Sequence, residues 1–247
     1  MGDLYEQFLE RDDLNIHKWH HYFPVYESAF GKFRGHAPKM LEIGVWRGGS
    51  ARLFADWLGD GTRITGVDIH PSCTAHAIPG RIDIAIGDQA DRSFLASLAA
   101  EHGPWDIILD DGGHTDRQIL TSFEVLFPHL KEGGVYLIED THAHWMNSSY
   151  RDHPKGYSVI HLVAELFSEM HRWTGDQSKF NDWHVPPPER PAPSPAPFFT
   201  NNVSAIHLYD SLVVIEKHQR HEPFAEVREA GKPRTSSYRL PPGAPGI

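Results

Sequence analysis

The sequence has little cysteine and no long apolar run. Cys73 is the only cysteine among the 247 residues, which excludes an internal disulfide bond. The polar start of the chain lacks the basic and apolar regions of a secretory signal. No apolar stretch approaches the roughly 18 residues needed to cross a bilayer. The sequence therefore predicts a cytoplasmic protein that does not bind membranes.

Basic residues are also scarce. Lys and Arg number 23 against 33 Asp and Glu, which gives a formal net charge of -10. No dense cluster of Lys and Arg is present that could neutralise a run of phosphates. The composition therefore argues against nucleic acid as a partner and leaves a small-molecule substrate and a homo-oligomer open.

What the sequence does contain is an alternation of strand and helix patterns. Buried strands are predicted at residues 39–45, 63–69, 81–88, 105–111 and 135–140. Amphipathic helices are predicted at residues 48–59, 91–103, 117–134 and 158–173, the third of them ending at a pair of glycines. This alternation predicts a parallel sheet covered on both faces, with ligands at the carboxyl ends of the strands.

The carboxyl-terminal part adds an antiparallel element. Residues 203–218 predict two strands joined at Tyr209, Asp210 and Ser211, a hairpin that would finish the sheet. A mainly parallel sheet with this ending is typical of the α/β Rossmann-type class I methyltransferase fold. We expect a single domain over residues 1–247. Its less regular parts are an amino-terminal cap segment, a Pro-rich loop and a tail, at residues 1–38, 184–200 and 238–247.

A glycine-containing motif follows the first predicted strand. Residues 41–50 read LEIGVWRGGS, with glycines at the turn from strand to helix, where a ligand can approach the backbone. Trp46 stands where a dinucleotide motif has its second glycine, which argues against NAD or FAD and is compatible with S-adenosylmethionine (SAM). A tight turn without a ligand is the alternative interpretation. The cofactor-binding residues expected here are Glu42, Gly44, Gly48 and Ser50.

Polar residues also close the following strands. Asp68 ends the second strand about 20 residues after the glycines, where a carboxylate commonly accepts the two ribose hydroxyls of an adenosyl group. Asp88 and Gln89 close the third strand, where the adenine amino group would lie, and Asp110 on the fourth strand is assigned to the same site. Alone, Asp68 could equally cap a helix or lie in a surface turn. The succession of such residues favours an adenosyl ligand.

Two acidic pairs end the fourth and fifth strands. We expect the four carboxylates to converge at the cleft rim, where like charges are unfavourable unless a cation or proton joins them. Oxygen donors without cysteine favour Mg²⁺, Mn²⁺ or Ca²⁺, while nearby histidines keep zinc or iron open. A helix cap and a solvated pair are the alternative. The four residues are Asp110, Asp111, Glu139 and Asp140.

Residues 109–145, in which an Asp-Asp-Gly-Gly-His motif precedes a Glu-Asp strand end, resemble the metal-dependent macrolide-sugar O-methyltransferases. They are similar also to short actinobacterial sugar methyltransferases, including those of methylated mannose polysaccharides. Residues 17–30 and 206–217 resemble the family's amino-terminal segment and closing hairpin, so most of the chain is covered. Gly113 replaces a common serine, and His17 precedes Lys18 where an aspartate is common.

The resemblance implies a Rossmann-type methyltransferase domain with a cofactor, a metal and a catalytic base. The implied SAM-binding residues are Gly44, Gly48, Asp68, Asp88 and Gln89. The implied metal ligands are Asp111, Glu139 and Asp140, with His114 as the base.

The residues themselves fit methylation of a sugar hydroxyl. The pKa of an alcohol lies far above neutral and is lowered by a bound cation, here Mg²⁺ or Mn²⁺. His114 could then accept the proton, because imidazole titrates near neutral pH; His144 is the competing base. His142, His144 and Trp145 directly follow the metal-binding strand and are the expected substrate residues, although ordinary loop packing explains them equally well.

Two other functions stay open. A catechol-type or small-molecule O-methyltransferase would use the same fold and Mg²⁺, but it would need an apolar slot for a flat ring. A non-catalytic SAM-binding or scaffolding protein would have no need of the acidic pairs and His114.

Overall fold

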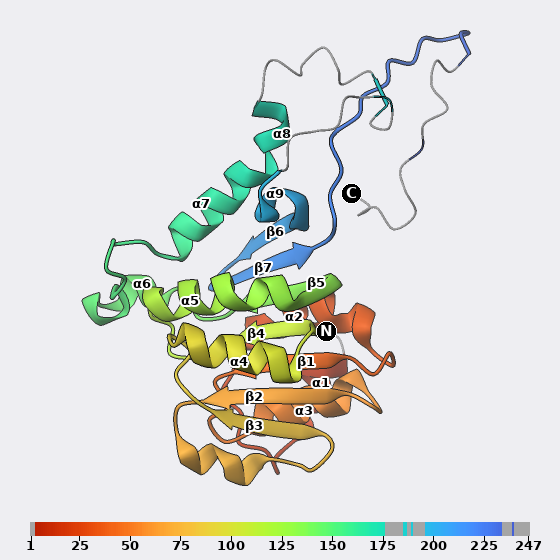
Figure 1. The fold of residues 1–247 in the computed structure, drawn as a ribbon. Helices are drawn as coiled ribbons and strands as arrows, with labels where there is room; N and C mark the ends of the chain where they lie inside the picture. Colours follow the sequence, from red (N-terminus) through yellow and green to blue (C-terminus); the bar gives the residue numbers. More distant parts are fainter. Residues whose placement is uncertain (1–2, 176–184, 187–188, 190–195, 234–238, 240–247) are drawn as a thin grey trace.

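The computed structural model describes residues 3–175, 185–186, 189, 196–233 and 239. Within these residues the strands form one seven-stranded sheet in the order β3-β2-β1-β4-β5-β7-β6 (Figure 1). β1 to β5 pair in parallel, and β7 is antiparallel to both β5 and β6. The predicted class I methyltransferase fold with an antiparallel ending is therefore confirmed. The strands are β1 (Lys39–Ile43), β2 (Arg63–Asp68), β3 (Ile82–Ile86), β4 (Trp105–Asp110), β5 (Leu130–Ile138), β6 (Val203–Tyr209) and β7 (Leu212–Lys217).

Helices cover both faces of the sheet (Figure 1). One apolar cluster joins the sheet to α4, α5 and α7, and the other joins its opposite face to α1, α2 and α3. Asp91 caps α4 by accepting two backbone N–H groups, and Thr115 and Gln118 form a capping box at the start of α5. The helices are α1 (Asp3–Glu10), α2 (Phe23–Phe30), α3 (Gly49–Leu58), α4 (Arg92–His102), α5 (Asp116–Leu126), α6 (Ala143–Met146), α7 (Val159–Met170), α8 (Arg172–Gly175) and α9 (Phe198–Asn202).

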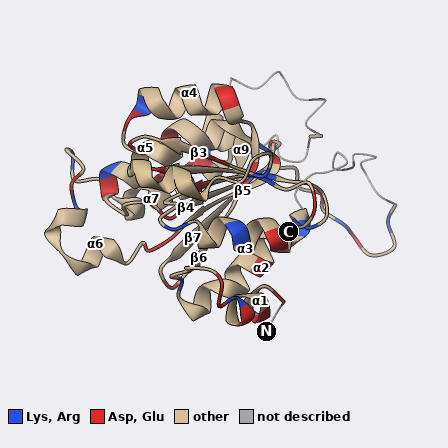
Figure 2. Cartoon of the chain, turned by 90° about the horizontal axis from the view of Figure 1, so that it is seen from below, with Lys and Arg blue, Asp and Glu red and all other residues tan. Residues whose placement is uncertain are grey.

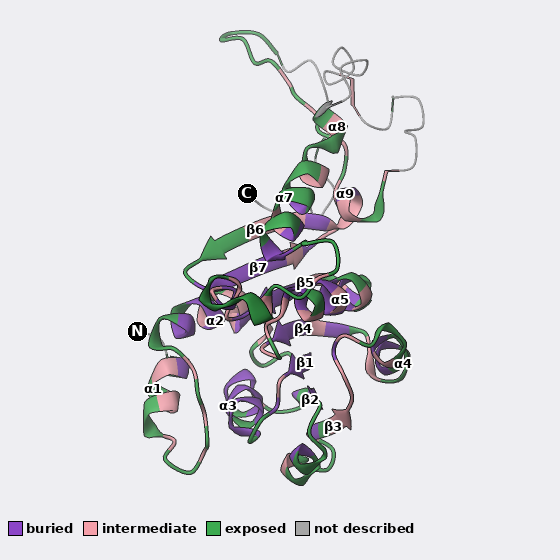
Figure 3. Cartoon of the chain, turned by 90° about the vertical axis from the view of Figure 1, so that its left-hand side faces the viewer, coloured by how far each residue is buried: buried purple, intermediate pink, exposed green. Residues whose placement is uncertain are grey.

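Burial changes sharply from the middle of the sheet to its edge. Figure 3 shows β4, β5 and β7 buried and β6 largely exposed. Strands covered on both faces need apolar residues at almost every position, as the runs in β4 and β5 provide. Among the described residues, no helix combines the length and apolar character that crossing a bilayer requires.

The helix predicted at residues 117–134 is too long. α5 ends at Leu126, a 3₁₀ turn containing Pro128 follows, and β5 begins at Leu130. Proline cannot donate a backbone hydrogen bond and stops the helix. Gly133 and Gly134 therefore lie inside β5, where the β4–β5 register shifts, instead of capping a helix. A Cβ at Gly134 would lie 3.0 Å from the carbonyl oxygen of Asp106, which explains the glycine there.

The three segments outside the predicted strands and helices differ in outcome. The amino-terminal segment forms α1 and α2, which pack on the core. The Pro-rich loop falls mostly outside the described residues, and its predicted end is wrong because α9 already begins at Phe198. The tail lies outside the described residues apart from Arg239.

We retain a single domain as a proposal, because the described strands share one sheet. In Figure 2, Lys and Arg lie interspersed with Asp and Glu on several elements.

Candidate active site

A cavity of about 850 Å³ opens at the carboxyl ends of the parallel strands. Most of the residues predicted to act in cofactor binding or catalysis reach it. Glu42, Gly48, Ser50 and Asp110 do not line it. The predicted residues that do are Gly44, Asp68, Asp88, Gln89, Asp111, His114 and Asp140.

Gly44 shows why a glycine follows β1. Its φ is +94°, and a Cβ built there would lie 1.9 Å from the carbonyl oxygen of Asp111. Any side chain would therefore push the loop after β4 away from the end of β1. Gly48 has a φ of +71° and lies against His76, so it holds the start of α3 close to the next loop.

Asp68 stands at the end of β2 with both carboxylate oxygens facing backbone donors. Oδ2 accepts from the N–H of Trp46 and Oδ1 from the N–H of His70, each at 2.9 Å. These two bonds fix the carboxylate between neighbouring loops. Each oxygen retains lone pairs, so the group can still accept two ribose hydroxyls.

Asp110 does not join the other acidic residues. It is buried and accepts hydrogen bonds from Gln89, at 3.0 Å, and from Ser122 and Tyr136. Burial raises the pKa of Asp110, although the bonds from Ser122 and Gln89 oppose the rise. The expected convergence of four carboxylates is therefore wrong for this residue, because side chains alternate between faces along a strand and only Asp111 turns to the cavity.

The side-chain amide of Gln89, after β3, bonds both to the end of β4 and to the loop that follows it. Its Oε1 accepts from the N–H of Gly113 at 2.8 Å, while its Nε2 donates to Asp110. A Cβ at Gly112 would lie 1.8 Å from that oxygen, which leaves no room for a side chain in the loop. Gln89 therefore shapes the cavity wall by holding the loop after β4.

Glu42 is a buried carboxylate in β1. Neither of its oxygens makes a hydrogen bond of ordinary geometry within the described residues. Burial raises the pKa of Glu42 to about 7, a rise that the charge of Lys18 and the hydroxyl of Ser50 offset only in part. Glu42 and Ser50 thus lie behind the cavity wall instead of facing a ligand directly.

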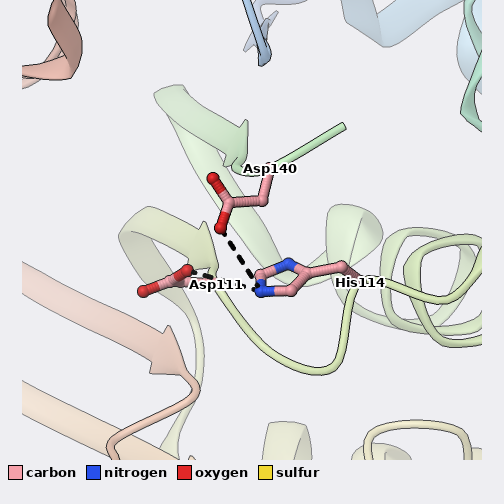
Figure 4. A group of neighbouring side chains, drawn as sticks. All are labelled: Asp111, His114 and Asp140. Atoms are coloured by element: carbon pink, nitrogen blue, oxygen red, sulfur yellow. Dashed lines mark ion pairs between the residues drawn. The ribbon is translucent and has the colours of Figure 1, made fainter. Parts of the chain in front are cut away.

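Asp111, His114 and Asp140 gather at the cavity (Figure 4). One ligand atom from each lies within 4.8 Å of the others; His114 Nε2 is 3.6 Å from Asp140 Oδ2 and 3.9 Å from Asp111 Oδ1. His114 and Asp140 have φ values of 59° and 52°. Such left-handed backbone costs roughly 1–3 kcal/mol in a residue other than glycine and is concentrated at functional sites. The two carboxylates supply oxygen donors, which suit Mg²⁺ or Mn²⁺.

Glu139 is held by the amino-terminal segment. Its Oε1 accepts from Lys18 Nζ and from the hydroxyl of Tyr26, each at 2.7 Å. Lys18 Nζ also lies 2.5 Å from Asp111 Oδ2 and is almost fully buried. Burial lowers the pKa of Lys18, but the carboxylates of Asp111 and Glu139 outweigh this and raise it above its usual range. A buried ammonium therefore pairs with Asp111, which lines the cavity, and with Glu139, which does not.

Comparison with known proteins agrees with this geometry. Residues 41–141 match a family model described as a methyltransferase domain. The 8-demethyl-8-(2-methoxy-alpha-L-rhamnosyl)-tetracenomycin-C 3'-O-methyltransferase of Streptomyces olivaceus is 32% identical, over 85% of this chain and 53% of that protein. The demethylmacrocin O-methyltransferase of Streptomyces fradiae is 34% identical, over 81% and 50%. The chain spans about half the length of the curated relatives it matches.

A solved structure extends the match to three dimensions. It is the MycE methyltransferase from the mycinamycin biosynthetic pathway in complex with Mg, SAH and mycinamycin VI. Its TM-score is 0.72 at 26% identity, over 94% of this chain and 57% of that one. Over most of its length, the chain is similar to sugar O-methyltransferases. The family resemblance read from the sequence is thereby confirmed.

The three predicted substrate residues separate into two groups. The His142 ring lies 4.7 Å from the ring of Trp19 in the amino-terminal segment. The Nδ1 atom of His144 lies 3.0 Å from the buried carboxylate of Asp116, at the start of α5. Trp145 contacts the His144 ring and is largely exposed. None of the three lines the cavity.

Sequence reasoning missed Lys18 and the polar roles of Tyr22 and Tyr26. The Tyr22 hydroxyl donates to Asp140 Oδ1 at 2.5 Å, and the Tyr26 hydroxyl to Glu139. A signal was present, since one lysine and two tyrosines occur within residues 17–30, the stretch that carries the family resemblance. Nothing in the order of residues, however, says that these side chains meet strand ends about a hundred positions later.

Proposed function

We propose that this chain is a divalent-metal-assisted O-methyltransferase that transfers the methyl group of SAM to a hydroxyl of a sugar or glycoside. One observation carries the proposal: a single cavity presents a carboxylate suited to an adenosyl ribose, Asp68, and the group of Asp111, His114 and Asp140. The names of the relatives, which include the mycinamicin VI 2''-O-methyltransferase of Micromonospora griseorubida, support a sugar acceptor.

The chain would hold the donor at the ends of β1 to β3. Asp68 is oriented by two backbone amides and accepts the ribose hydroxyls, while Asp88 lines the cavity one strand further along. Gly44 allows the close approach of the ligand to the backbone. When bound, SAM would supply a methyl group activated by its sulfonium, and Mg²⁺ or Mn²⁺ would lower the pKa of the acceptor hydroxyl.

Asp111 and Asp140 would hold the metal, with Glu139 as the third ligand. Glu139 does not line the cavity, and Lys18 and Tyr26 both bind its Oε1, so it would contribute to the metal site only through its second oxygen. The ring of His114 faces the two aspartates and lines the cavity. A ring nitrogen cannot bind a cation and accept a proton at the same time, so we assign Nε2 of His114 to the proton of the acceptor hydroxyl. The neighbouring carboxylates then stabilise the imidazolium.

His144 is the weaker candidate for the base. It does not line the cavity, and its Nδ1 is paired with Asp116. Burial raises the pKa of Asp116, and the charge of His144 opposes the rise. We infer that this pair holds the loop after Asp140 against α5.

A methyl-transfer assay tests the function directly. The chain is incubated with SAM labelled in its methyl group, Mg²⁺ and a panel of simple glycosides, with catechols as the rival acceptors. Incorporation of label into glycosides, lost with a chelator and restored by Mg²⁺, is the expected result. Label in catechols alone would favour the small-molecule enzyme, and binding of SAM without transfer to any acceptor would favour the scaffold.

The predictions on location and partners go with this proposal. A sugar or glycoside acceptor agrees with the relatives' names. A cytoplasmic location, the absence of nucleic-acid and membrane partners, and a homo-oligomer stay predictions; fractionation of the producing cells and light scattering of the pure protein test them.

A further inference from the structure

Trp19 is an exposed aromatic residue that lies beside the group of acidic side chains. It precedes Tyr22, whose ring stacks on it with centroids 5.9 Å apart and planes 17° apart. The rings of His21 and His142 contact it at 5.3 and 4.7 Å. Even so, Trp19 remains 41% exposed. A large apolar surface is thus held in a fixed orientation and still faces solvent.

Two short routes lead from this ring to Asp140. The hydroxyl of Tyr22 donates to Asp140 Oδ1 at 2.5 Å, and Nδ1 of His142 lies 4.0 Å from the same oxygen. Trp19 is therefore one side chain away from a carboxylate that lines the cavity. Trp19, Tyr22 and His142 do not themselves line the cavity, so an acceptor would reach the tryptophan by extending past Asp140.

Trp145 offers the contrasting case. It is 62% exposed, and its one ring contact among the described residues is with His144, which is paired with Asp116 on α5. Trp19 has three ring contacts, and one of its ring partners donates to Asp140. An aromatic that is already ordered loses less conformational entropy when a ligand binds. Trp19 is the better prepared of the two.

We propose that Trp19, supported by His142, is the platform on which the sugar ring of the acceptor stacks, and that it determines specificity for glycosides. This inference rests on the proposed function. Sugars present apolar C–H faces, which pack on the π face of an aromatic ring, and their hydroxyls point outward to polar groups. The platform and Asp140 therefore hold different parts of one acceptor.

The test uses a matched pair of variants of the full chain. Trp19→Leu keeps apolar bulk and removes the π face, whereas Trp19→Phe keeps an aromatic ring. We expect Trp19→Leu to raise KM for the methylated glycoside roughly 3- to 10-fold with kcat little changed, and Trp19→Phe to restore most of the loss. Calorimetry should show unchanged binding of SAH. Phe167→Leu, an exposed ring on α7, is the control and should leave KM unchanged.

Three results would overturn the inference, and they are distinguishable. An active wild type whose KM does not change in Trp19→Leu shows that the ring does not touch the sugar. A rise of KM in Trp145→Leu alone assigns the platform to Trp145. If the wild type methylates no glycoside, the proposed function fails, and the inference fails with it. Thermal unfolding of each variant shows whether it is folded. If Trp19→Leu does not fold, the KM of Trp19→Phe still tests the inference.

Discussion

The donor side and the acceptor side of the cavity are built in different ways. On the donor side, at the ends of β1 to β3, the wall consists of strand-to-helix turns whose residues bond to nearby backbone. Asp68, for example, accepts from Trp46 and His70, 22 and 2 residues away. Gly44 is required by the close approach of the backbone at Asp111, in the loop after β4. Apart from that contact, turn geometry at neighbouring strand ends, which a sequence motif can specify, forms this side.

The acceptor side depends on contacts between distant parts of the chain. Lys18 reaches Asp111 and Glu139 across 93 and 121 positions, and Tyr22 reaches Asp140 across 118. The backbone oxygen of Asp210, in the β6–β7 turn, lies 3.3 Å from Nε2 of His21. The comparison teaches that the donor site is a property of the strand-to-helix turns, whereas the acceptor site is a property of the assembled fold. The following experiments test that division.

The largest effect is expected from the carboxylates of the acceptor side. Asp111→Asn or Asp140→Asn should reduce turnover at least roughly 1,000-fold, because each removes a negative ligand from the metal site. Affinity for SAH, measured by calorimetry, should change little, since Asp68 and Gly44 are untouched. Full activity in excess chelator would show that the reaction does not need a metal, and it would contradict the role given to these carboxylates.

Loss of the base should have the next largest effect. His114→Gln should lower kcat roughly 10²- to 10⁴-fold while metal and SAH binding survive. His207→Gln, an exposed histidine that pairs with Glu216 on β7, is the control. A normal kcat for His114→Gln together with a loss in His144→Gln would transfer the role to His144.

A pH dependence of stability is expected from Glu42, which lies behind the donor side. Its pKa rises from 4.5 to about 7 on folding, so folded Glu42 keeps a proton that the unfolded chain releases between these values. The contribution of Glu42 to the free energy of unfolding therefore falls as pH rises from about 4.5 to 7. The fall amounts to about 3 kcal/mol, at about 1.4 kcal/mol for each pH unit, and the contribution stays low at higher pH.

The Glu42→Gln substitution should remove this contribution of Glu42 to the pH dependence. Urea unfolding of the apo protein should show the variant and the wild type equally stable near pH 4.5, and the variant more stable by about 3 kcal/mol at pH 8. A constant difference across this pH range would show that Glu42 does not carry the dependence.

The smallest effect is expected from Asp68. Asp68→Asn should weaken SAH binding roughly 10- to 100-fold, the range for a hydrogen bond to a charged group, and leave the KM for the glycoside unchanged. Calorimetry measures the first quantity and initial rates the second. A larger effect on the glycoside than on SAH would show that the donor and acceptor sides are not separate.

The sequence predicted the fold well because its signals are local. Apolar runs gave the strands of the sheet, and residues 203–218 gave the hairpin that distinguishes this fold. The error at residues 117–134 came from treating Gly133 and Gly134 as a helix cap when Pro128 had already ended the helix. The apolar residues on both sides of Pro128 fit one helical periodicity, so the pattern alone did not separate the helix from a strand that contains a bulge.

The candidate site was predicted less completely. Strand ends indicated which residues meet, but they could not show that Asp110 faces the core while Asp111 faces the cavity, since one position along a strand reverses the direction of a side chain. The contacts of Lys18 and Trp19 were not predicted because they depend on where the amino-terminal segment packs. Pairing between distant segments leaves no spacing in the sequence to detect.

The ion pairs of Lys18 also bear on the order of folding. Its ammonium needs partners from the residues directly after β4 and β5, and a buried charge without a partner is strongly unfavourable. Contacts between residues so far apart form only after long loops have closed. We therefore expect the amino-terminal segment to dock late, after the central strands have paired. The site would then be complete only at the end of folding, so the appearance of activity would show that the chain has reached its native state.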